Sequence, residues 1–276
     1  MGNLFEIIGK NESVPETERL LFHGGTELLL VSGGQGSLIL DGEMIPLSRG
    51  SLVLIPPGTL HLTAALPQSA FSRSVLRFEA AKLEAFSSAQ TPLCRVFAET
   101  ARTSFLTEDD TERLEALFEN CGLKGEGFGA DLRSELVFLE LLMSVWELIR
   151  EEPPFAANVS RERERLEPLI RRIREAPPST VTLETVAGEF HYNKNYLCRV
   201  FRGATGISVG GYITAVRVTE AARCLRQGLS VKESGEKAGF RNNSNYISTF
   251  HRVTGLSPGQ YRQAACAGKG DEDGTF

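Results

Sequence analysis

The sequence predicts an α+β fold with two domains. An N-terminal β-barrel with helices precedes a C-terminal all-α domain, in which a linker helix joins two helix-turn-helix motifs. Three observations predict this: aliphatic runs alternate with glycine turns up to about residue 85, helical periodicity begins near residue 107, and the C-terminal part contains an internal repeat. A chain of 276 residues is long enough to bury two ordinary cores.

The barrel is predicted from the spacing of its turns. Short β-rich runs between residues 26 and 66 are separated by glycine-containing turns, and the Asp41-Gly42 pair is a strong hairpin signal. Residues 72–80 have the pattern of one further strand. Strands at such even spacing are typical of a small antiparallel barrel or sandwich.

Helical periodicity predicts the rest of the N-terminal domain, at about residues 107–150. Thr107 is followed by three acidic residues, which is the form of a helix N-terminus. Further on, apolar residues recur at alternating steps of four and three: Leu132, Leu136, Leu139, Met143 and Trp146. The sequence leaves two interpretations of this apolar stripe open, namely packing of the helix on the barrel or a dimer interface.

A proline-containing and then charged stretch separates the two halves at residues 151–165. It divides the chain into four expected parts: the N-terminal domain 1–155 (barrel about 1–85, helices about 107–150), the linker 156–165, the all-α domain 166–265 and the flexible tail 266–276. The first helix of the all-α domain is expected to end at Pro177-Pro178.

The C-terminal half contains an internal near-repeat. Segment 193–208 aligns with segment 242–257 at an offset of 49 residues. Each copy opens on an asparagine suited to an N-cap and ends near a glycine suited to the left-handed conformation of a helix C-terminus: Asn193 and Gly206, Asn242 and Gly255.

Each copy follows a short predicted helix, at residues 183–190 and 231–238. A short helix, a turn and a second helix form the helix-turn-helix plan. Residues 208–226 between the copies predict one linker helix, which would hold two recognition helices at a fixed separation. Motifs about 34 Å apart would enter successive major grooves on one side of a DNA duplex.

Charge is divided unevenly between the halves. Residues 1–160 carry 12 Lys and Arg against 23 Asp and Glu, whereas residues 161–262 carry 17 against 9. A basic domain joined to an acidic one favours a polyanion as partner of the basic half. The absence of long apolar stretches, of a secretory start and of paired cysteines indicates a cytoplasmic protein.

The most specific motif is LSVKESGEKAGFRNNSNYISTFHRVTGLSPGQYR, residues 229–262. With its Gly239-Phe240 and Ser257-Pro258 pairs, the region 166–262 resembles the DNA-binding domain of the AraC/XylS transcription regulators. The segment PPGTLH at 56–61 makes the barrel resemble the cupin-like effector domain common in that family. The resemblance implies a regulator of the AraC type whose partners are promoter DNA, a small-molecule effector, a second copy of the chain and, for an activator, RNA polymerase.

The resemblance and helix geometry together imply a set of polar residues that face DNA: Asn193, Lys194, Asn195, Cys198, Arg199, Arg202, Asn243, Ser244, Asn245, Ser248 and Arg252. Arg199 is best suited to bond a guanine with two hydrogen bonds. Ser248 stands at the corresponding place in the second helix, so weaker contacts are expected there. Tyr196 is expected in the core. Ser234-Gly235 replaces the usual Ile-Ala, which predicts a weak first helix in the second motif.

Metal-dependent cupin enzymes need histidines in H-x-H spacing. The barrel region has only His23 and His61, and neither has a histidine two residues away. We therefore expect no metal, no cofactor and no catalytic residue, and both histidines become candidate effector contacts. For His61 a loop-stabilising role is the alternative. A cupin-type metal-dependent enzyme fused to a DNA-binding domain is retained as the second functional hypothesis.

Overall fold

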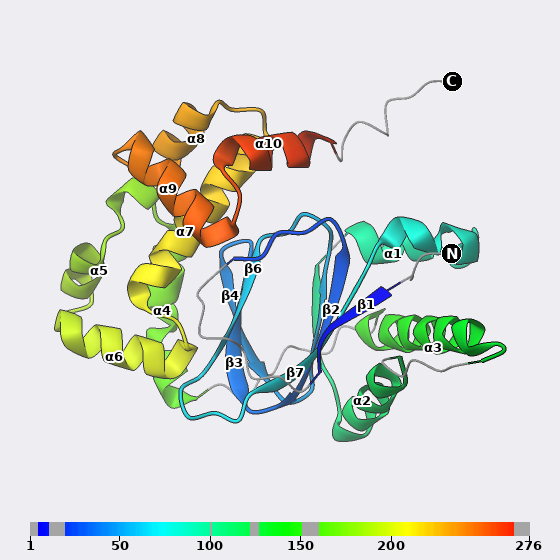
Figure 1. The fold of residues 1–276 in the computed structure, drawn as a ribbon. Helices are drawn as coiled ribbons and strands as arrows, with labels where there is room; N and C mark the ends of the chain where they lie inside the picture. The colour runs from blue at the N-terminus through cyan, green and yellow to red at the C-terminus, as the bar shows by residue number, and fades with distance from the viewer. Residues whose placement is uncertain (1–4, 11–19, 100, 122–126, 151–159, 268–276) are drawn as a thin grey trace.

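Four layers of secondary structure make up the computed structural model, which describes residues 5–10, 20–99, 101–121, 127–150 and 160–267. Two β-sheets lie in the middle, the helices of the N-terminal half cover one side, and the helices of the C-terminal half cover the other (Figure 1). The α+β fold class, with strands and helices first and a helical part second, is confirmed. Part of the predicted linker and most of the predicted tail lie outside the described residues.

The strands form two antiparallel sheets. They are β1 Phe5–Lys10, β2 Thr26–Gly33, β3 Gln35–Leu40, β4 Glu43–Ser48, β5 Ser51–Ile55, β6 His61–Ala65, β7 Ser72–Phe78 and β8 Arg102–Phe105. One sheet has the strand order β1-β7-β2-β5-β8 and the other the order β4-β3-β6. The β3–β4 hairpin turns at Asp41 and Gly42, whose φ angles of 45° and 84° match the predicted two-residue turn.

The predicted β-barrel does not close. Among the described residues the strands divide into two separate ladders, so the sheets face each other as a sandwich. The physical reason lies in the connections at Gly33-Gly34 and Arg49-Gly50, which carry the chain from one sheet to the other. Strands that follow each other there come to lie in opposite sheets instead of pairing.

Each sheet is covered on both faces, and the sequence of β2 shows the consequence. Leu28 and Leu30 pack against the N-terminal helices, while Leu29 and Val31 pack between the sheets. A strand buried on both faces is apolar without alternation. The outer face of the β4-β3-β6 sheet, which includes Ile39, packs against the C-terminal helices.

The N-terminal half contains helices α1 Leu93–Glu99, α2 Glu108–Cys121 and α3 Ala130–Arg150, and a 3₁₀ helix, η1 Ala80–Phe86. The predicted start of α2 is confirmed, because the Thr107 hydroxyl accepts a hydrogen bond from the Asp110 N–H at 3.2 Å. Strands β1 and β8 and helix α1 were not predicted individually, because they are too short to show a clear period in the sequence.

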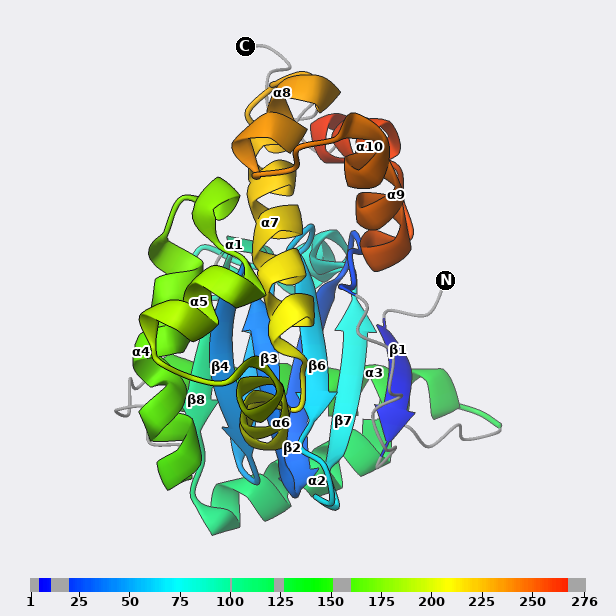
Figure 2. The same ribbon diagram turned by 90° about the vertical axis from the view of Figure 1, so that its left-hand side faces the viewer.

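The C-terminal half contains α4 Arg161–Glu175, η2 Pro178–Thr180, α5 Leu183–Glu189, α6 Lys194–Thr205, α7 Val209–Arg226, α8 Val231–Lys237, α9 Asn243–Thr254 and α10 Pro258–Ala267. The pairs α5–α6 and α8–α9 lie beside opposite ends of α7 (Figures 1 and 2). No helix within the described ranges combines the length and the apolar character that crossing a membrane requires.

Candidate DNA interface

The first helix-turn-helix motif is α5, a four-residue turn and α6. The Thr182 hydroxyl accepts a hydrogen bond from the Thr185 N–H, and the Asn193 side chain accepts hydrogen bonds from the first turn of α6. Gly206 ends α6 with a φ of 78°, in the left-handed conformation that the sequence predicted. These local bonds fix where α6 begins and ends.

The outer face of α6 carries five of the eleven residues that were expected to face DNA. Asn195, Arg199 and Arg202 are exposed, and Cys198 is half-buried. Lys194 is exposed too, but its Nζ lies 2.9 Å from a carboxylate oxygen of Glu184 on α5. An approaching phosphate would therefore compete with Glu184 for this ammonium group.

Tyr196 does not lie in the core, contrary to the sequence-based expectation. Its side chain is 46% exposed, whereas its neighbour Leu197 is buried. The guanidinium carbon of Arg199 lies 5.7 Å from the centre of the Tyr196 ring, within the range of a cation–π contact. The apolar face of α6 is narrower than expected, so Tyr196 supports the arginine beside it on the outer face.

The second motif is built in the same way from α8, a five-residue turn and α9. Ser230 and Glu233 form a capping box, in which the side chain of each accepts a hydrogen bond from the other's backbone N–H, and Asn242 caps α9. Polar side chains along α9 are exposed: Asn243, Ser244, Asn245, Ser248 and Arg252. Most of this outer face is neutral, in contrast to that of α6.

The sequence predicted that Gly235 weakens α8, but the structure shows a packing role for this glycine. A Cβ atom at this position would lie 2.6 Å from Cδ1 of Tyr246 in α9, so only glycine lets the ring approach this closely. The Tyr246 hydroxyl lies 3.0 Å from the Ser234 hydroxyl, which satisfies both buried groups. Gly235 thus leaves space for the large ring of Tyr246, and Ser234 supplies the hydrogen-bond partner of its hydroxyl.

Helix α7 connects the motifs. It has 18 residues, so its axis is about 27 Å long at 1.5 Å per residue. Its Arg217 donates hydrogen bonds to the carbonyl oxygens of Pro178 and Val181, at 3.1 and 2.8 Å from Nη2. The backbone of Gly239, in the turn of the second motif, packs against the same segment, at Pro178 and Ser179. Both motifs are therefore tied to α7 and to the chain that precedes α5.

The C-terminal helices are docked on the β4-β3-β6 sheet. The buried Arg163 of α4 donates a hydrogen bond to the Met44 carbonyl oxygen at 3.0 Å, and the Tyr212 hydroxyl donates one to the Gly42 carbonyl oxygen at 3.1 Å. Burial lowers the pKa of Arg163 and raises that of Tyr212. At the other end of α7, the rings of Phe22 and Tyr261 lie 4.5 Å apart. The two halves thus share a continuous contact.

In the N-terminal half, the structure brings His23 and His61 together around Glu27. The His23 Nε2 atom lies 3.0 Å from Glu27 Oε2, and the His61 Nε2 atom lies 3.6 Å from Glu27 Oε1. Burial favours the neutral carboxyl of Glu27, but the two histidines outweigh it and hold its pKa well below the usual range. Spacing within the sequence did not reveal this cluster, because Glu27 completes it and His61 reaches it from another sheet.

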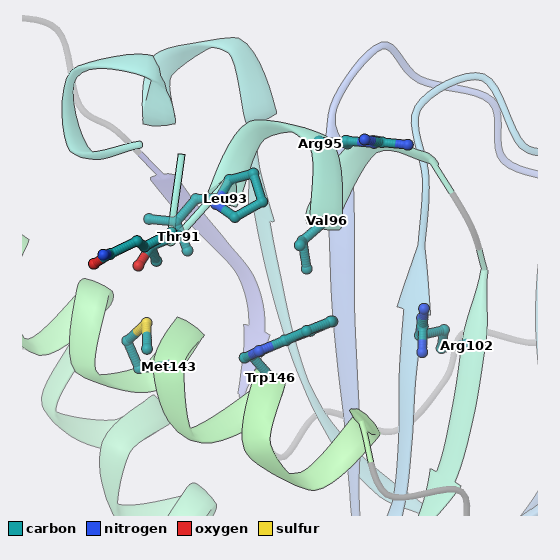
Figure 3. Close-up of a pocket in the computed structure, with 9 residues that line it drawn as sticks. Thr91, Leu93, Arg95, Val96, Arg102, Met143 and Trp146 are labelled. Carbon is teal, nitrogen blue, oxygen red and sulfur yellow. The ribbon is translucent and has the colours of Figure 1, made fainter. Parts of the chain in front are cut away.

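The apolar stripe on α3 faces outward. Leu132 and Leu136 are 58% and 57% exposed, and Met143 is also exposed, while Leu139 and Trp146 are half-buried. The opposite face of α3 packs against the N-terminal core. Met143 and Trp146 also line a pocket of about 380 Å³, together with residues of α1 and the segment before it (Figure 3). Packing of the helix therefore leaves Leu132, Leu136 and Met143 uncovered by the described chain, whereas Leu139 and Trp146 also contact the N-terminal core.

Two family models match the chain. One, described as an AraC-like ligand binding domain, matches residues 16–142. The other, described as a helix-turn-helix domain, matches residues 186–264. They fall on the two halves that the structure places on opposite sides of the docking contact.

Several proteins are similar to parts of the chain. The Melibiose operon regulatory protein of Escherichia coli (strain K12) is 33% identical over 92 residues, which are 33% of this chain and 30% of that protein. The HTH-type transcriptional activator RhaR of Pectobacterium carotovorum subsp. carotovorum (strain PC1) is 25% identical over 154 residues, 55% of this chain and 52% of that protein. The chain therefore spans about half or less of the length of these relatives. Among solved structures, the match to ToxT from Vibrio cholerae covers 95% of this chain and 98% of the ToxT chain, with 13% sequence identity and a TM-score of 0.37.

Proposed function

We propose a function from one premise: the chain belongs to the AraC/XylS family of transcription regulators. It binds promoter DNA sequence-specifically, with α6 and α9 entering successive major grooves of one duplex. The observation that carries this proposal is the placement of two capped recognition helices at opposite ends of one rigid helix, with their polar faces exposed. The length of α7, about 27 Å, is compatible with motifs one turn of B-DNA apart.

The residues proposed to contact DNA are the exposed polar residues of α6 and α9. Arg199 bonds a guanine edge, and Asn195 pairs with an adenine. Lys194, released from Glu184, and Arg202 hold phosphates, which position the helix without reading sequence. The neutral side chains of α9 add weaker contacts, so α6 carries most of the specificity.

Selection of fragments of the source genome by the full-length chain tests this proposal. We expect a recurrent motif among the bound fragments, and a binding constant that falls steeply as salt rises, because bound phosphates release counterions. Arg199→Ala should relax the preference at one base pair, whereas Arg133→Ala, an equal charge change on α3 of the N-terminal half, should leave it unaltered. Fragments without a shared motif would refute sequence-specific binding.

We further propose that the N-terminal half controls DNA binding through an effector or through dimerisation. The exposed stripe on α3 supports a homodimer, because a second copy could cover it symmetrically. Since Met143 is exposed, Met143→Glu should leave the domain folded and yield a monomer with weakened DNA binding. Sedimentation of the wild type and of Glu147→Gln, a control on the same helix, should show dimers. A monomeric wild type, with and without DNA, would reject the dimer.

A further inference from the structure

The hydrogen bonds of His23 and His61 determine which ring nitrogen of each carries a proton. The His23 Nδ1 atom lies 2.8 Å from the Gly25 carbonyl oxygen, and the His61 Nδ1 atom lies 3.0 Å from the Thr59 carbonyl oxygen. A carbonyl oxygen only accepts hydrogen bonds, so each Nδ1 is the donor. In a neutral imidazole the Nε2 atom then carries a lone pair.

Both of these lone pairs are directed at the same carboxylate. The two Nε2 atoms and a carboxylate oxygen of Glu27 all lie within 4.8 Å of one another. His61 is 1% exposed, and among the described residues its Nε2 atom has no hydrogen-bond partner. When both imidazoles are neutral, three acceptors thus converge at a buried point, which is electrostatically unfavourable unless a proton or a metal ion lies between them.

Arg77 supplies only part of that charge. Its Nη2 atom lies 3.1 Å from Glu27 Oε2, the oxygen that also faces His23. The other oxygen, Oε1, faces His61 and has no guanidinium beside it in the described chain. Glu27 therefore keeps one oxygen available as a ligand, next to the unpartnered nitrogen of His61.

The backbone around the three residues is fixed before any ligand binds. Glu27 lies in β2 and pairs with Ile55 and Arg77 on either side, and His61 opens β6 and forms a bridge with Leu21. His23 follows this bridge by two residues. The cluster thus joins the two sheets at one end of the sandwich, on a rigid frame.

We propose that His23, Glu27 and His61 bind one divalent transition-metal ion of the zinc class. Two imidazole nitrogens and one carboxylate oxygen form a three-ligand set that suits such ions, and a fourth position stays open for water or an effector. Ligating histidines characteristically donate their other ring N–H to a backbone carbonyl, as both do here. The hard ions Mg²⁺ and Ca²⁺ favour oxygen ligands and fit this set poorly. The proposal goes beyond DNA binding, and its test needs no DNA.

The test uses full-length, tag-free protein freed of metal by chelation. Titration with Zn²⁺ should show one ion per chain at micromolar concentration, and Co²⁺ should give visible absorption bands of nitrogen and oxygen coordination. His23→Ala and Glu27→Gln should each weaken Zn²⁺ binding by more than the roughly 10–100-fold that loss of an outer partner costs. His251→Ala, which removes an exposed histidine of α9, is the matched control and should bind like the wild type.

Two results would overturn the proposal. One is the absence of Zn²⁺ and Co²⁺ binding to the folded wild type, which would mean that a proton shared with Glu27 satisfies the cluster. The other is unchanged binding in both His23→Ala and Glu27→Gln. His23 is nearest the surface, so its variant is expected to fold even if changes at the buried Glu27 or His61 do not, and circular dichroism checks this.

Discussion

The two helix-turn-helix motifs share a plan but distribute volume and charge differently. Ala187 of α5 and Leu197 of α6 occupy the positions that Gly235 and Tyr246 occupy in the second motif, and all four residues are buried. The first motif thus pairs the methyl group of Ala187 with the medium-sized side chain of Leu197. The second motif pairs Gly235, which has no side chain, with the large ring of Tyr246. The same helix arrangement is reached with two different distributions of volume, while the outer faces differ because α6 carries arginines where α9 carries neutral side chains.

The largest effect, on the free energy of unfolding, should come from replacing one residue of the Gly235–Tyr246 pair by the residue that the first motif has at that position. Gly235→Ala would place a methyl group against the Tyr246 ring and should cost about 1–3 kcal/mol of unfolding free energy. Tyr246→Leu would leave a void and remove one of the two hydrogen bonds of the Ser234 hydroxyl, which keeps its bond to the Val231 carbonyl oxygen, at a cost of about 2–3 kcal/mol. The double variant recreates the pair of the first motif and should cost less than the sum of the single changes, as denaturant unfolding would measure.

Gly188→Ala is the control for that cycle. Gly188 lies in the first helix of the first motif, and no atom lies within 4 Å of a Cβ placed there. Alanine should therefore be neutral or stabilise the protein by up to about 1 kcal/mol, from helix propensity alone. Strictly additive losses at Gly235 and Tyr246 would show that the two positions do not compensate each other.

The next effect concerns DNA affinity and tests the difference in charge. Arg199→Ala should cost about 1–3 kcal/mol of binding free energy, and Ser248→Ala should cost less. Introducing the missing charge as Ser248→Arg should raise overall affinity and the salt dependence of binding. Equal losses for the two alanine variants in a binding titration would remove the proposed inequality between α6 and α9.

The smallest effect should come from the ring beneath Arg199. Tyr196→Leu removes the cation–π contact and should weaken DNA binding by about 0.5–1 kcal/mol, because the guanidinium is held less firmly. Tyr196→Phe keeps the ring and serves as the control. If both variants bind DNA equally well, the tyrosine ring has no part in positioning Arg199.

Features set by local chemistry could be predicted from the sequence. The caps at Asn193 and Asn242 and the left-handed glycines 206 and 255 depend on residues within one helical turn, and all are confirmed. Features set by distant partners could not. The need for glycine at position 235 depends on a ring eleven residues away in another helix, and the exposure of Tyr196 depends on how far the apolar face of α6 extends.

The N-terminal half shows the same limit more strongly. The turn at Asp41-Gly42 was predicted because two residues determine it, whereas barrel and sandwich differ only in how distant strands pair. The cluster around Glu27 escaped prediction because Glu27 and His61 come from two different sheets. Residues that approach each other only through the tertiary fold leave no spacing to detect.

The outer face of the β4-β3-β6 sheet belongs to the same apolar core as the C-terminal helices. This shared core limits the exchange of either half by recombination. Recombination that joined this N-terminal half to the C-terminal half of a relative would place Ile39 and Leu62 against a foreign surface and leave the Met44 carbonyl oxygen without its donor Arg163. Such hybrids should be selected against unless the contact surfaces changed together. The two halves of this chain are therefore expected to have diverged as a single heritable unit.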